Sequence, residues 1–270
     1  MNKVEGDVES RIREFYDSEG WVRGDDGKTQ EDRFFRSFGR SRAGYNARVR
    51  RRTVSQFEGR NGVLLIAGGG DLPDSHMQVA AQFDAVVCVD ISWRALALNR
   101  EKLGAKGQYH LGSILEIPLA DATVDAVLCA HVLYHVDARD QERAVRELIR
   151  VTRPGGRVVI LYMNPRAPLN LTQSMLKRLS FNRMGRKADL YKYVYPLSWW
   201  RRFENAATVR LLPSDVMSTA QSEALRLDSA IGTRFFDWAA RFEDAAPRVA
   251  LKLWGYPVIV LDPKPSASLR

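Results

Sequence analysis

The chain has 270 residues, of which 45% are hydrophobic and 27% charged, and its formal net charge is +9 at pH 7. This length and composition suit one large globular domain and exclude a disordered or low-complexity chain. Its first ten residues lack an apolar stretch, and its apolar runs are shorter than the roughly 18 residues of a membrane span, so we expect a cytoplasmic protein without membrane insertion. The only cysteines, Cys88 and Cys129, lie in separate apolar runs, which indicates buried free thiols and no metal site.

Residues 1–60 are polar and rich in arginine. The pattern predicts short helices over 31–38 and 45–57, which we expect to form an N-terminal helical lid or extension. Eight arginines and no acid lie between Arg33 and Arg52, and a second basic stretch from Arg166 to Arg202 contains Asp189 as its single acid. Such stretches are either solvated faces or contacts for an anionic partner, such as a phosphorylated or carboxylated substrate, a nucleic acid or a membrane surface.

From residue 62 onward, short apolar runs alternate with helical patterns. The predicted strands span 63–67, 85–89, 108–111, 124–130 and 157–163, and the predicted helices span 74–83, 92–103 and 138–151. This alternation is typical of parallel β-α-β units in a doubly wound α/β sheet, which binds ligands at the carboxyl edge of its strands. We therefore predict one domain over 61–270. An insertion at about 164–202 interrupts it, and further elements follow at 209–212, 234–242 and 256–261.

Two features at this edge predict a nucleoside ligand. The first strand runs into Ala67-Gly68-Gly69-Gly70-Asp71, and a ligand that lies against a strand-to-helix turn needs backbone without side chains. The second strand ends in Asp90, about 20 residues further on, where a carboxylate can accept both hydroxyls of a ribose. The dinucleotide pattern G-x-G-x-x-G is not made, because Pro73 takes the place of its third glycine. A plain tight turn and an acid at a helix N-terminus are the alternative explanations.

The stretch from 63 to 165 resembles class I S-adenosylmethionine-dependent methyltransferases, in the small-molecule group that includes the ubiquinone/menaquinone enzymes. The matching segments are VLLIAGGG (63–70), VDIS (89–92), GSILEIPL (112–119), VDAVL (124–128), HVLYHV (131–136) and RVTRPGGRVVI (150–160). The last segment is the most specific. The resemblance implies a mostly parallel, seven-stranded sheet with one antiparallel strand and helices on both faces. It also implies S-adenosylmethionine as cofactor and S-adenosylhomocysteine as product.

The same resemblance assigns the cofactor site. Its positions are Ala67, Gly68, Gly69, Gly70, Asp71, Asp90, Ile91, Ser113, Ile114, Ala130 and His131. The glycines would face the methionine part and Asp90 the ribose. Ile91, Ser113 and Ile114 would meet the adenine, and Ala130 and His131 would border the methionine end.

The chain departs from the family pattern at several of these positions. The family usually has an acid where Leu65 stands, glycine where Ala67 and Asp71 stand, and often an acid where Ser113 stands. We predict that Asp71 replaces an acid near the methionine ammonium.

Histidine is the side chain best suited to remove a proton from an alcohol acceptor, because its ordinary pKa lies near 7. His131 and His135 follow the fourth strand at the active edge. We predict His135 as the general base and His131 as a contact in the pocket, with plain packing as the alternative for both. An amine acceptor would need no base. Aromatic side chains predicted to contact the substrate are Tyr16, Trp21, Tyr134 and Tyr162.

The predicted function is methyl transfer to an oxygen or nitrogen of a small, anionic metabolite or natural-product intermediate. One alternative is a lipid or quinone methyltransferase at a membrane surface, favoured by the basic charge and by exposure of Trp199 and Trp200. A non-methylating cofactor-binding homologue is another, and a third is an RNA methyltransferase. The fourth strand ends in Cys129-Ala130-His131 and lacks the Asn/Asp-Pro-Pro-aromatic sequence that holds a base amine, which argues against nucleic acid. The sequence is compatible with either a monomer or a homodimer.

Overall fold

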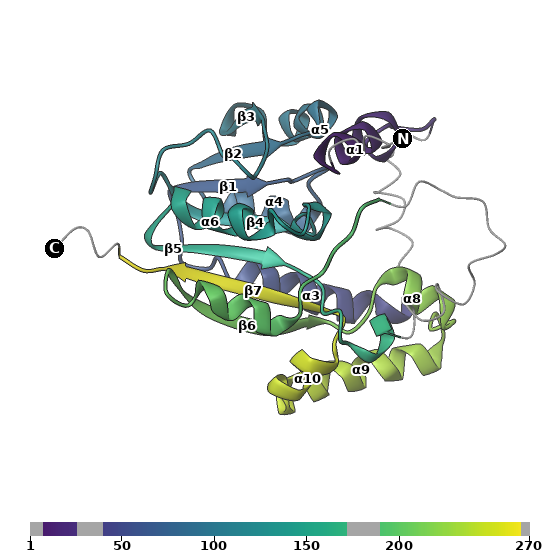
Figure 1. Ribbon diagram of the computed structural model, residues 1–270. Coiled ribbons are helices and arrows are strands. Elements are labelled where there is room, and N and C mark those ends of the chain that lie inside the picture. The colour runs from purple at the N-terminus through teal and green to yellow at the C-terminus, as the bar shows by residue number, and fades with distance from the viewer. Residues whose placement is uncertain (1–7, 26–39, 172–189, 266–270) are drawn as a thin grey trace, which may run out of the picture.

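Seven strands form one sheet in the order β3-β2-β1-β4-β5-β7-β6 (Figure 1). This computed structural model describes residues 8–25, 40–171 and 190–265. The strands are β1 (Val63–Ala67), β2 (Ala85–Asp90), β3 (Gly107–Leu111), β4 (Val124–Ala130), β5 (Thr152–Leu161), β6 (Ala207–Asp215) and β7 (Tyr256–Pro263). Strands β1 to β5 pair in parallel, and β7 is antiparallel to both β5 and β6. The predicted fold class is therefore confirmed.

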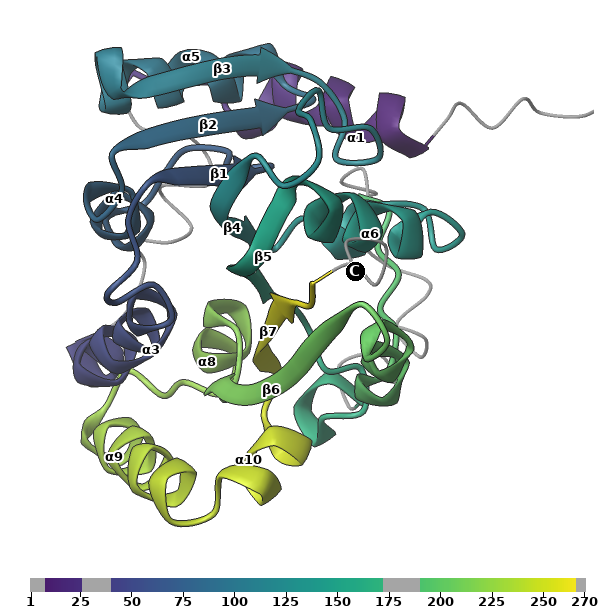
Figure 2. The same cartoon turned by 90° about the vertical axis from the view of Figure 1, so that its left-hand side faces the viewer.

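Alternate side chains of the strands build two apolar layers, as the period of two in a strand requires. Leu64 and Ile66 of β1 face one layer, whereas Leu65 and Ala67 face the other. The first layer is covered by α3 (Ala43–Ser55), α4 (Asp74–Ala81) and α5 (Trp93–Leu103), and the second by α6 (Gln141–Val151) and η5 (Leu197–Phe203) (Figure 2). Both faces of the sheet are thus buried, which explains the nearly continuous apolar runs in the sequence.

Further helices lie at the two sides of this sandwich. The N-terminal segment, residues 8–25, contains α1 (Val8–Phe15) and η1 (Tyr16–Gly20), and η1 contacts α5 (Figure 1). At the other side lie α8 (Thr219–Ala224), α9 (Ala230–Ala245) and α10 (Pro247–Leu253), and α9 and α10 form a smaller apolar cluster with Tyr45 of α3. Three short 3-10 turns lie between these elements: η2 (Arg40–Arg42), η3 (Gly104–Lys106) and η4 (Leu133–His135).

Two expectations need correction. The strand expected over 157–163 begins earlier, because β5 starts at Thr152 and crosses Pro154-Gly155-Gly156 with a shift of register. Gly155 has a φ of 79°, a conformation that lets the backbone make such a bulge. Trp199 and Trp200 are 6% and 0% exposed in the layer beside α6, so they form no membrane-facing surface.

Other predicted elements cannot be compared. The predicted helix 31–38 and residues 172–189 of the insertion at 164–202 lie outside the described residues. None of the helices in the described ranges combines the length and the apolar character needed to cross a bilayer.

Candidate functional site

A cavity of about 670 Å³ opens at the carboxyl edge of the parallel strands. It is lined by the loops that follow β1 to β4, by the N-terminal segment and by α3. Among the predicted site residues, those that line it are Gly68, Gly69, Gly70, Asp71, Asp90, Ile91, Ser113, Ile114, Ala130, His131, His135, Tyr16 and Trp21. Residues from five separate parts of the chain therefore share one space.

Three predicted residues do not line this cavity. Ala67 is fully buried in β1, and Tyr134 is buried in η4. Tyr162 is also fully buried, where its hydroxyl donates to Gln141 Oε1 at 2.9 Å and accepts from the backbone N–H of Tyr195 at 3.0 Å. These contacts hold Tyr162 in the core.

The glycine turn after β1 is constrained by both conformation and space. Gly68 and Gly70 have φ values of 70° and 54°, which other residues rarely adopt. A methyl group on Gly70 would lie 2.3 Å from Cζ2 of Trp21, and one on Gly68 would lie 2.5 Å from Cγ2 of Val132. The turn thus lines the cavity with backbone, and Val132 and Trp21 fill the space that a side chain at Gly68 or Gly70 would need. The next residue, Asp71, forms an ion pair with Lys102.

Asp90 connects the loop after β1 with the loop after β2 through hydrogen bonds. Its carboxylate accepts from the backbone N–H of Ser92 at 2.8 Å and from that of Gly70 at 3.2 Å. Burial raises the pKa of Asp90 to about 6, although the Ser92 and Gly70 N–H groups lower it. The carboxylate is therefore ionised at neutral pH and becomes protonated as the pH falls through about 6.

The N-terminal segment contacts each of the first three loops. The Trp21 ring stacks on Tyr16 and covers Gly70 of the first loop. Asp17 accepts from the Ser92 hydroxyl of the second loop at 2.6 Å, and Glu9 accepts from the Ser113 hydroxyl of the third. Sequence reasoning missed Glu9 and Asp17. The one available signal was the missing acid at Ser113, beside which Glu9 now places a carboxylate.

His131 and His135 face the cavity from the end of β4. His131 has a φ of 63°, an uncommon conformation for a non-glycine residue and one often found at functional sites. His135 Nδ1 lies 2.8 Å from the carbonyl oxygen of Tyr191, which can only accept, so Nδ1 carries the proton and Nε2 has a free lone pair. Burial lowers the pKa of both imidazoles to about 4. Both are neutral at physiological pH.

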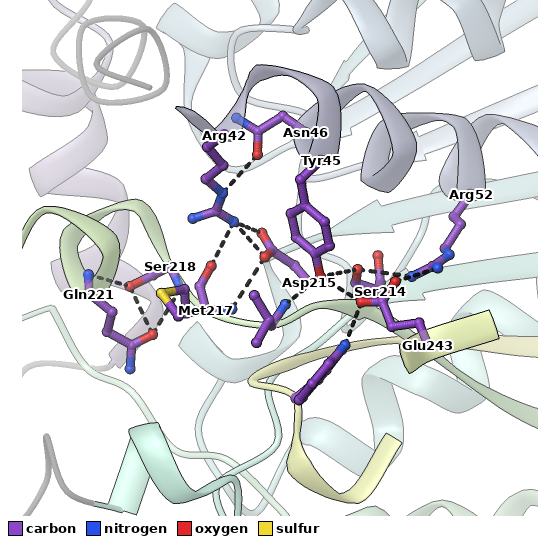
Figure 3. A network of polar contacts seen from close by, with 12 residues as sticks. Arg42, Tyr45, Asn46, Arg52, Ser214, Asp215, Met217, Ser218, Gln221 and Glu243 are labelled. Atoms are coloured by element: carbon purple, nitrogen blue, oxygen red, sulfur yellow. Dashed lines mark hydrogen bonds and ion pairs between the residues drawn. The ribbon is translucent and has the colours of Figure 1, made fainter. Parts of the chain in front are cut away.

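A second wall of the cavity was not expected from the sequence. It includes Asn46 and Arg50 of α3, His76 of α4 and Asp215 of β6. Figure 3 shows that Asn46 and Asp215 both accept hydrogen bonds from the guanidinium of Arg42.

Three of the six arginines of the first basic stretch that the structure describes form ion pairs within the protein. Arg42 binds Asp215, Arg52 binds Glu243, and Arg48 binds Asp244. Glu243 is the centre of a buried network, where its carboxylate also accepts from the Tyr45 hydroxyl and from Trp254 Nε1 (Figure 3). These arginines hold η2 and α3 against β6 and α9, whereas Arg50 lines the cavity.

Comparisons with known proteins agree with this geometry. Residues 66–160 match the family model described as a methyltransferase domain. The ubiquinone/menaquinone biosynthesis C-methyltransferase of Idiomarina loihiensis is 34% identical over 145 residues, which cover 49% of this chain and 57% of that protein. The first curated relatives are matched over 41% to 64% of their own length.

Solved structures share the fold over a greater length. Geranyl diphosphate methyltransferase, in complex with GPP and sinefungin, superimposes with a TM-score of 0.59 at 16% identity, covering 94% of this chain and 98% of that one. Magnesium protoporphyrin IX methyltransferase of Synechocystis PCC 6803, with bound S-adenosylhomocysteine, gives a TM-score of 0.57 at 15% identity, covering 94% and 99%. The resemblance inferred from the sequence is thus confirmed: residues 66–160 match a methyltransferase domain, and this part of the chain is similar to the ubiquinone/menaquinone C-methyltransferases.

Proposed function

We propose that this protein binds S-adenosylmethionine in the cavity and transfers its methyl group to a small-molecule acceptor. The observation that carries the proposal is that one cavity joins the loops after β1 to β3 with the two histidines after β4. The first set of residues suits a nucleoside, and the second suits an acceptor whose proton must be removed. Methyl transfer requires both partners to be held together in a space closed to water.

The residues of the cavity fit the cofactor. The buried Asp90 carboxylate can accept hydrogen bonds from the two ribose hydroxyls, which is the chemistry expected at the end of the second strand. The backbone of Gly68 to Gly70 lines the part of the cavity where we place the methionine part, and Ile91 and Ile114 offer apolar surface to the adenine. The bound cofactor would supply an activated methyl group on sulfonium sulfur.

His135 is the residue we propose for proton removal. The Tyr191 carbonyl holds the Nδ1–H, so Nε2 is the basic nitrogen. Its pKa near 4 keeps it unprotonated and available at neutral pH, at the cost of a weak driving force for proton transfer. This arrangement serves an acidic hydroxyl, such as a phenol or an enol, better than a simple alcohol.

The structure offers fewer arginines to an anionic acceptor than the basic stretches of the sequence suggested. Arg42, Arg48 and Arg52 are engaged by acidic side chains of the protein. Arg50 lines the cavity, and we propose it as the contact for an anionic group of the acceptor.

A lipid-borne acceptor is the second candidate, and the surface of α9 and α10 favours it. Exposed apolar side chains follow these helices, namely Ile231, Trp238, Val249 and Leu253. Exposed basic residues lie beside them, namely Arg234, Arg241, Arg248 and Lys252. Neighbouring apolar and basic rows are typical of helices that lie on an anionic membrane surface. The resemblance to quinone methyltransferases supports the same reading, and C-methylation of a quinol ring is then the expected reaction.

The first test is calorimetric titration with S-adenosylmethionine and S-adenosylhomocysteine, with NAD as control. The proposal expects binding of the first two and none of the third. Binding of NAD alone, or of none of the three, would refute it. Acceptors would then be screened in two parallel sets, anionic metabolites and short-chain quinols, with transfer of a labelled methyl group as the readout.

A further inference from the structure

Asp215 occupies a position at the active edge that mirrors that of Asp90. Strand β6 pairs antiparallel with β7, and β7 pairs antiparallel with β5, so β6 runs in the same direction as the parallel strands. Asp215 ends β6 and therefore lies at the same edge as Asp90, which ends β2. Both carboxylates line the same cavity.

Arg42 holds Asp215 in place without covering it. Nη2 of Arg42 donates to both carboxylate oxygens at 2.5 Å, and the backbone N–H of Met217 donates to Oδ1 at 3.3 Å (Figure 3). The arginine side chain is 2% exposed, whereas that of Asp215 is 22% exposed. A carboxylate offers about four acceptor positions, so Oδ2 retains one for a ligand in the cavity.

Asn46 is oriented by the same arginine. Its Oδ1 accepts from Arg42 Nε at 2.8 Å, which fixes the amide and leaves Nδ2 on the other side. Asn46 is 5% exposed and lines the cavity, and among the residues that the structure describes Nδ2 finds no acceptor. A buried donor without a partner costs about 1–3 kcal/mol, so its presence at a cavity points to a ligand that supplies the acceptor.

We propose that Asp215 and Asn46 form a subsite that binds a hydroxyl group of the methyl acceptor. A hydroxyl donates one hydrogen bond and accepts others, which matches a carboxylate and an amide N–H held by one guanidinium. A carbonyl would turn its lone pairs toward Asp215, and an ammonium would face the Asn46 donor and Arg42. This subsite orients the acceptor while His135 lies on another wall, so Asp215 and Asn46 determine specificity and Arg42 is a positioning residue.

Ionisation of the subsite agrees with this role. Burial raises the pKa of Asp215 to about 6, and Arg42 counteracts part of that rise. The carboxylate is consequently charged at neutral pH, and a hydrogen bond to a charged group is stronger than one between neutral groups. Arg42 and Glu243 are the charged groups that face Asp215 most closely.

The inference rests on the proposed function, and its test distinguishes failure of the subsite from failure of the proposed function. The probe is phenol, titrated in the presence of saturating S-adenosylhomocysteine and compared with its methyl ether, anisole. Binding is followed through the side-chain amide signal of Asn46 in nuclear magnetic resonance spectra, assigned by its loss in Asn46→Asp. If S-adenosylhomocysteine does not bind, the proposed function fails, and the phenol titration is read on the protein alone.

We expect phenol to shift the Asn46 signal to saturation, and anisole to bind at least about tenfold more weakly. Asp215→Asn should weaken phenol binding by about tenfold or more. The matched control is Asp262→Asn, which removes an arginine-paired carboxylate of similar exposure at the far end of β7. An unmoved Asn46 signal, equal binding of anisole, or full phenol binding by a folded Asp215→Asn variant would each overturn the inference. If Asp215→Asn does not fold, the comparison of phenol with anisole in the wild-type protein decides whether the subsite exists.

Discussion

The Ser113 hydroxyl donates a hydrogen bond to the carboxylate of Glu9, a residue 104 positions earlier in the chain. Through this contact α1 reaches the loop after β3, while Asp17 and Trp21 reach the loops after β2 and β1. All of these residues except Asp17 line the cavity. The N-terminal segment is thus one wall of the proposed cofactor site and is held there by side-chain contacts.

Glu9→Ala should weaken binding of S-adenosylhomocysteine about two- to tenfold, because one hydrogen bond at a partly exposed site contributes about 0.5–1.5 kcal/mol. Protease cleavage within residues 8–25 should also become faster. Glu14→Ala is the matched control, since Glu14 is an exposed residue of the same helix. Equal affinities of the two variants for S-adenosylhomocysteine would show that Glu9 has no part in the site.

Gly70→Ala should lower both stability and cofactor affinity. The positive φ costs about 1–2 kcal/mol for any other residue, and the added methyl group would also displace Trp21. Gly104→Ala separates the two effects, because Gly104 has a φ of 55° but no atom within 4 Å of an added methyl group. We expect both variants to lose thermal stability, and Gly70→Ala to lose more, because its added methyl group also displaces Trp21. Lower affinity and altered Trp21 fluorescence should be confined to Gly70→Ala.

Much of the sheet could be predicted from the sequence, because its buried strands are continuous apolar runs bounded by glycines and acids. Gly68 to Gly70 and Asp90 could be placed for the same reason, since each follows directly from a strand end. The second wall could not be predicted. The expected strand at 209–212 stops short of Asp215, and only the pairing of β6 with β7 brings that residue to the active edge. Nor could the partners of Arg42, Arg48 and Arg52 be seen, because each lies more than 170 residues away.

Cofactor affinity should depend on the ionisation of Asp90. The pKa of this carboxylate is about 6 in the free protein, so the carboxylate is charged above that pH and is lost as an acceptor below it. Affinity for S-adenosylhomocysteine should be constant from about pH 7 to 8 and fall as the pH drops through 6. Burial lowers the pKa of His76 to about 3 and that of His131 and His135 to about 4, so these groups stay neutral across this range.

Asp90→Asn is the variant that isolates this effect. It should bind about tenfold to a hundredfold more weakly at pH 7.5, as expected for a hydrogen bond to a charged group, and its affinity should not change with pH. Asp215→Asn should keep the pH dependence, because Asp215 lies on the other wall. A pH profile in Asp90→Asn that parallels the wild type would assign the titration to another group.

The imidazole of His135 should be neutral, with its proton on Nδ1, from about pH 5.5 to 8. Its hydrogen bond to the Tyr191 carbonyl fixes the tautomer, and burial keeps the pKa near 4. Nitrogen-15 chemical shifts, assigned with His135→Gln, report both properties. A titration midpoint near 6.5 or a proton on Nε2 would remove His135 as the proposed base. With a hydroxyl acceptor, His135→Gln should reduce kcat by about 10²- to 10⁴-fold.

Trp238 should contribute to binding of anionic membranes if the acceptor is carried in a lipid phase. It is 52% exposed in the middle of α9, and Arg234 and Arg241 lie one turn away on either side. Burial of one large apolar side chain contributes about 1.5–3 kcal/mol, so Trp238→Ser should reduce binding to vesicles that contain phosphatidylserine by about tenfold or more.

The matched control is Trp93→Ser, because Trp93 is 54% exposed on α5, which packs on β2 and β3 at the opposite end of the sheet. Co-sedimentation of both variants with vesicles at low and high salt separates the apolar contribution from the electrostatic one, since salt screens only the latter. Wild-type protein that stays in the supernatant at low salt, or equal losses in the two tryptophan variants, would exclude this surface as a membrane contact. The acceptor would then have to enter the cavity from solution, which favours the water-soluble, anionic candidates.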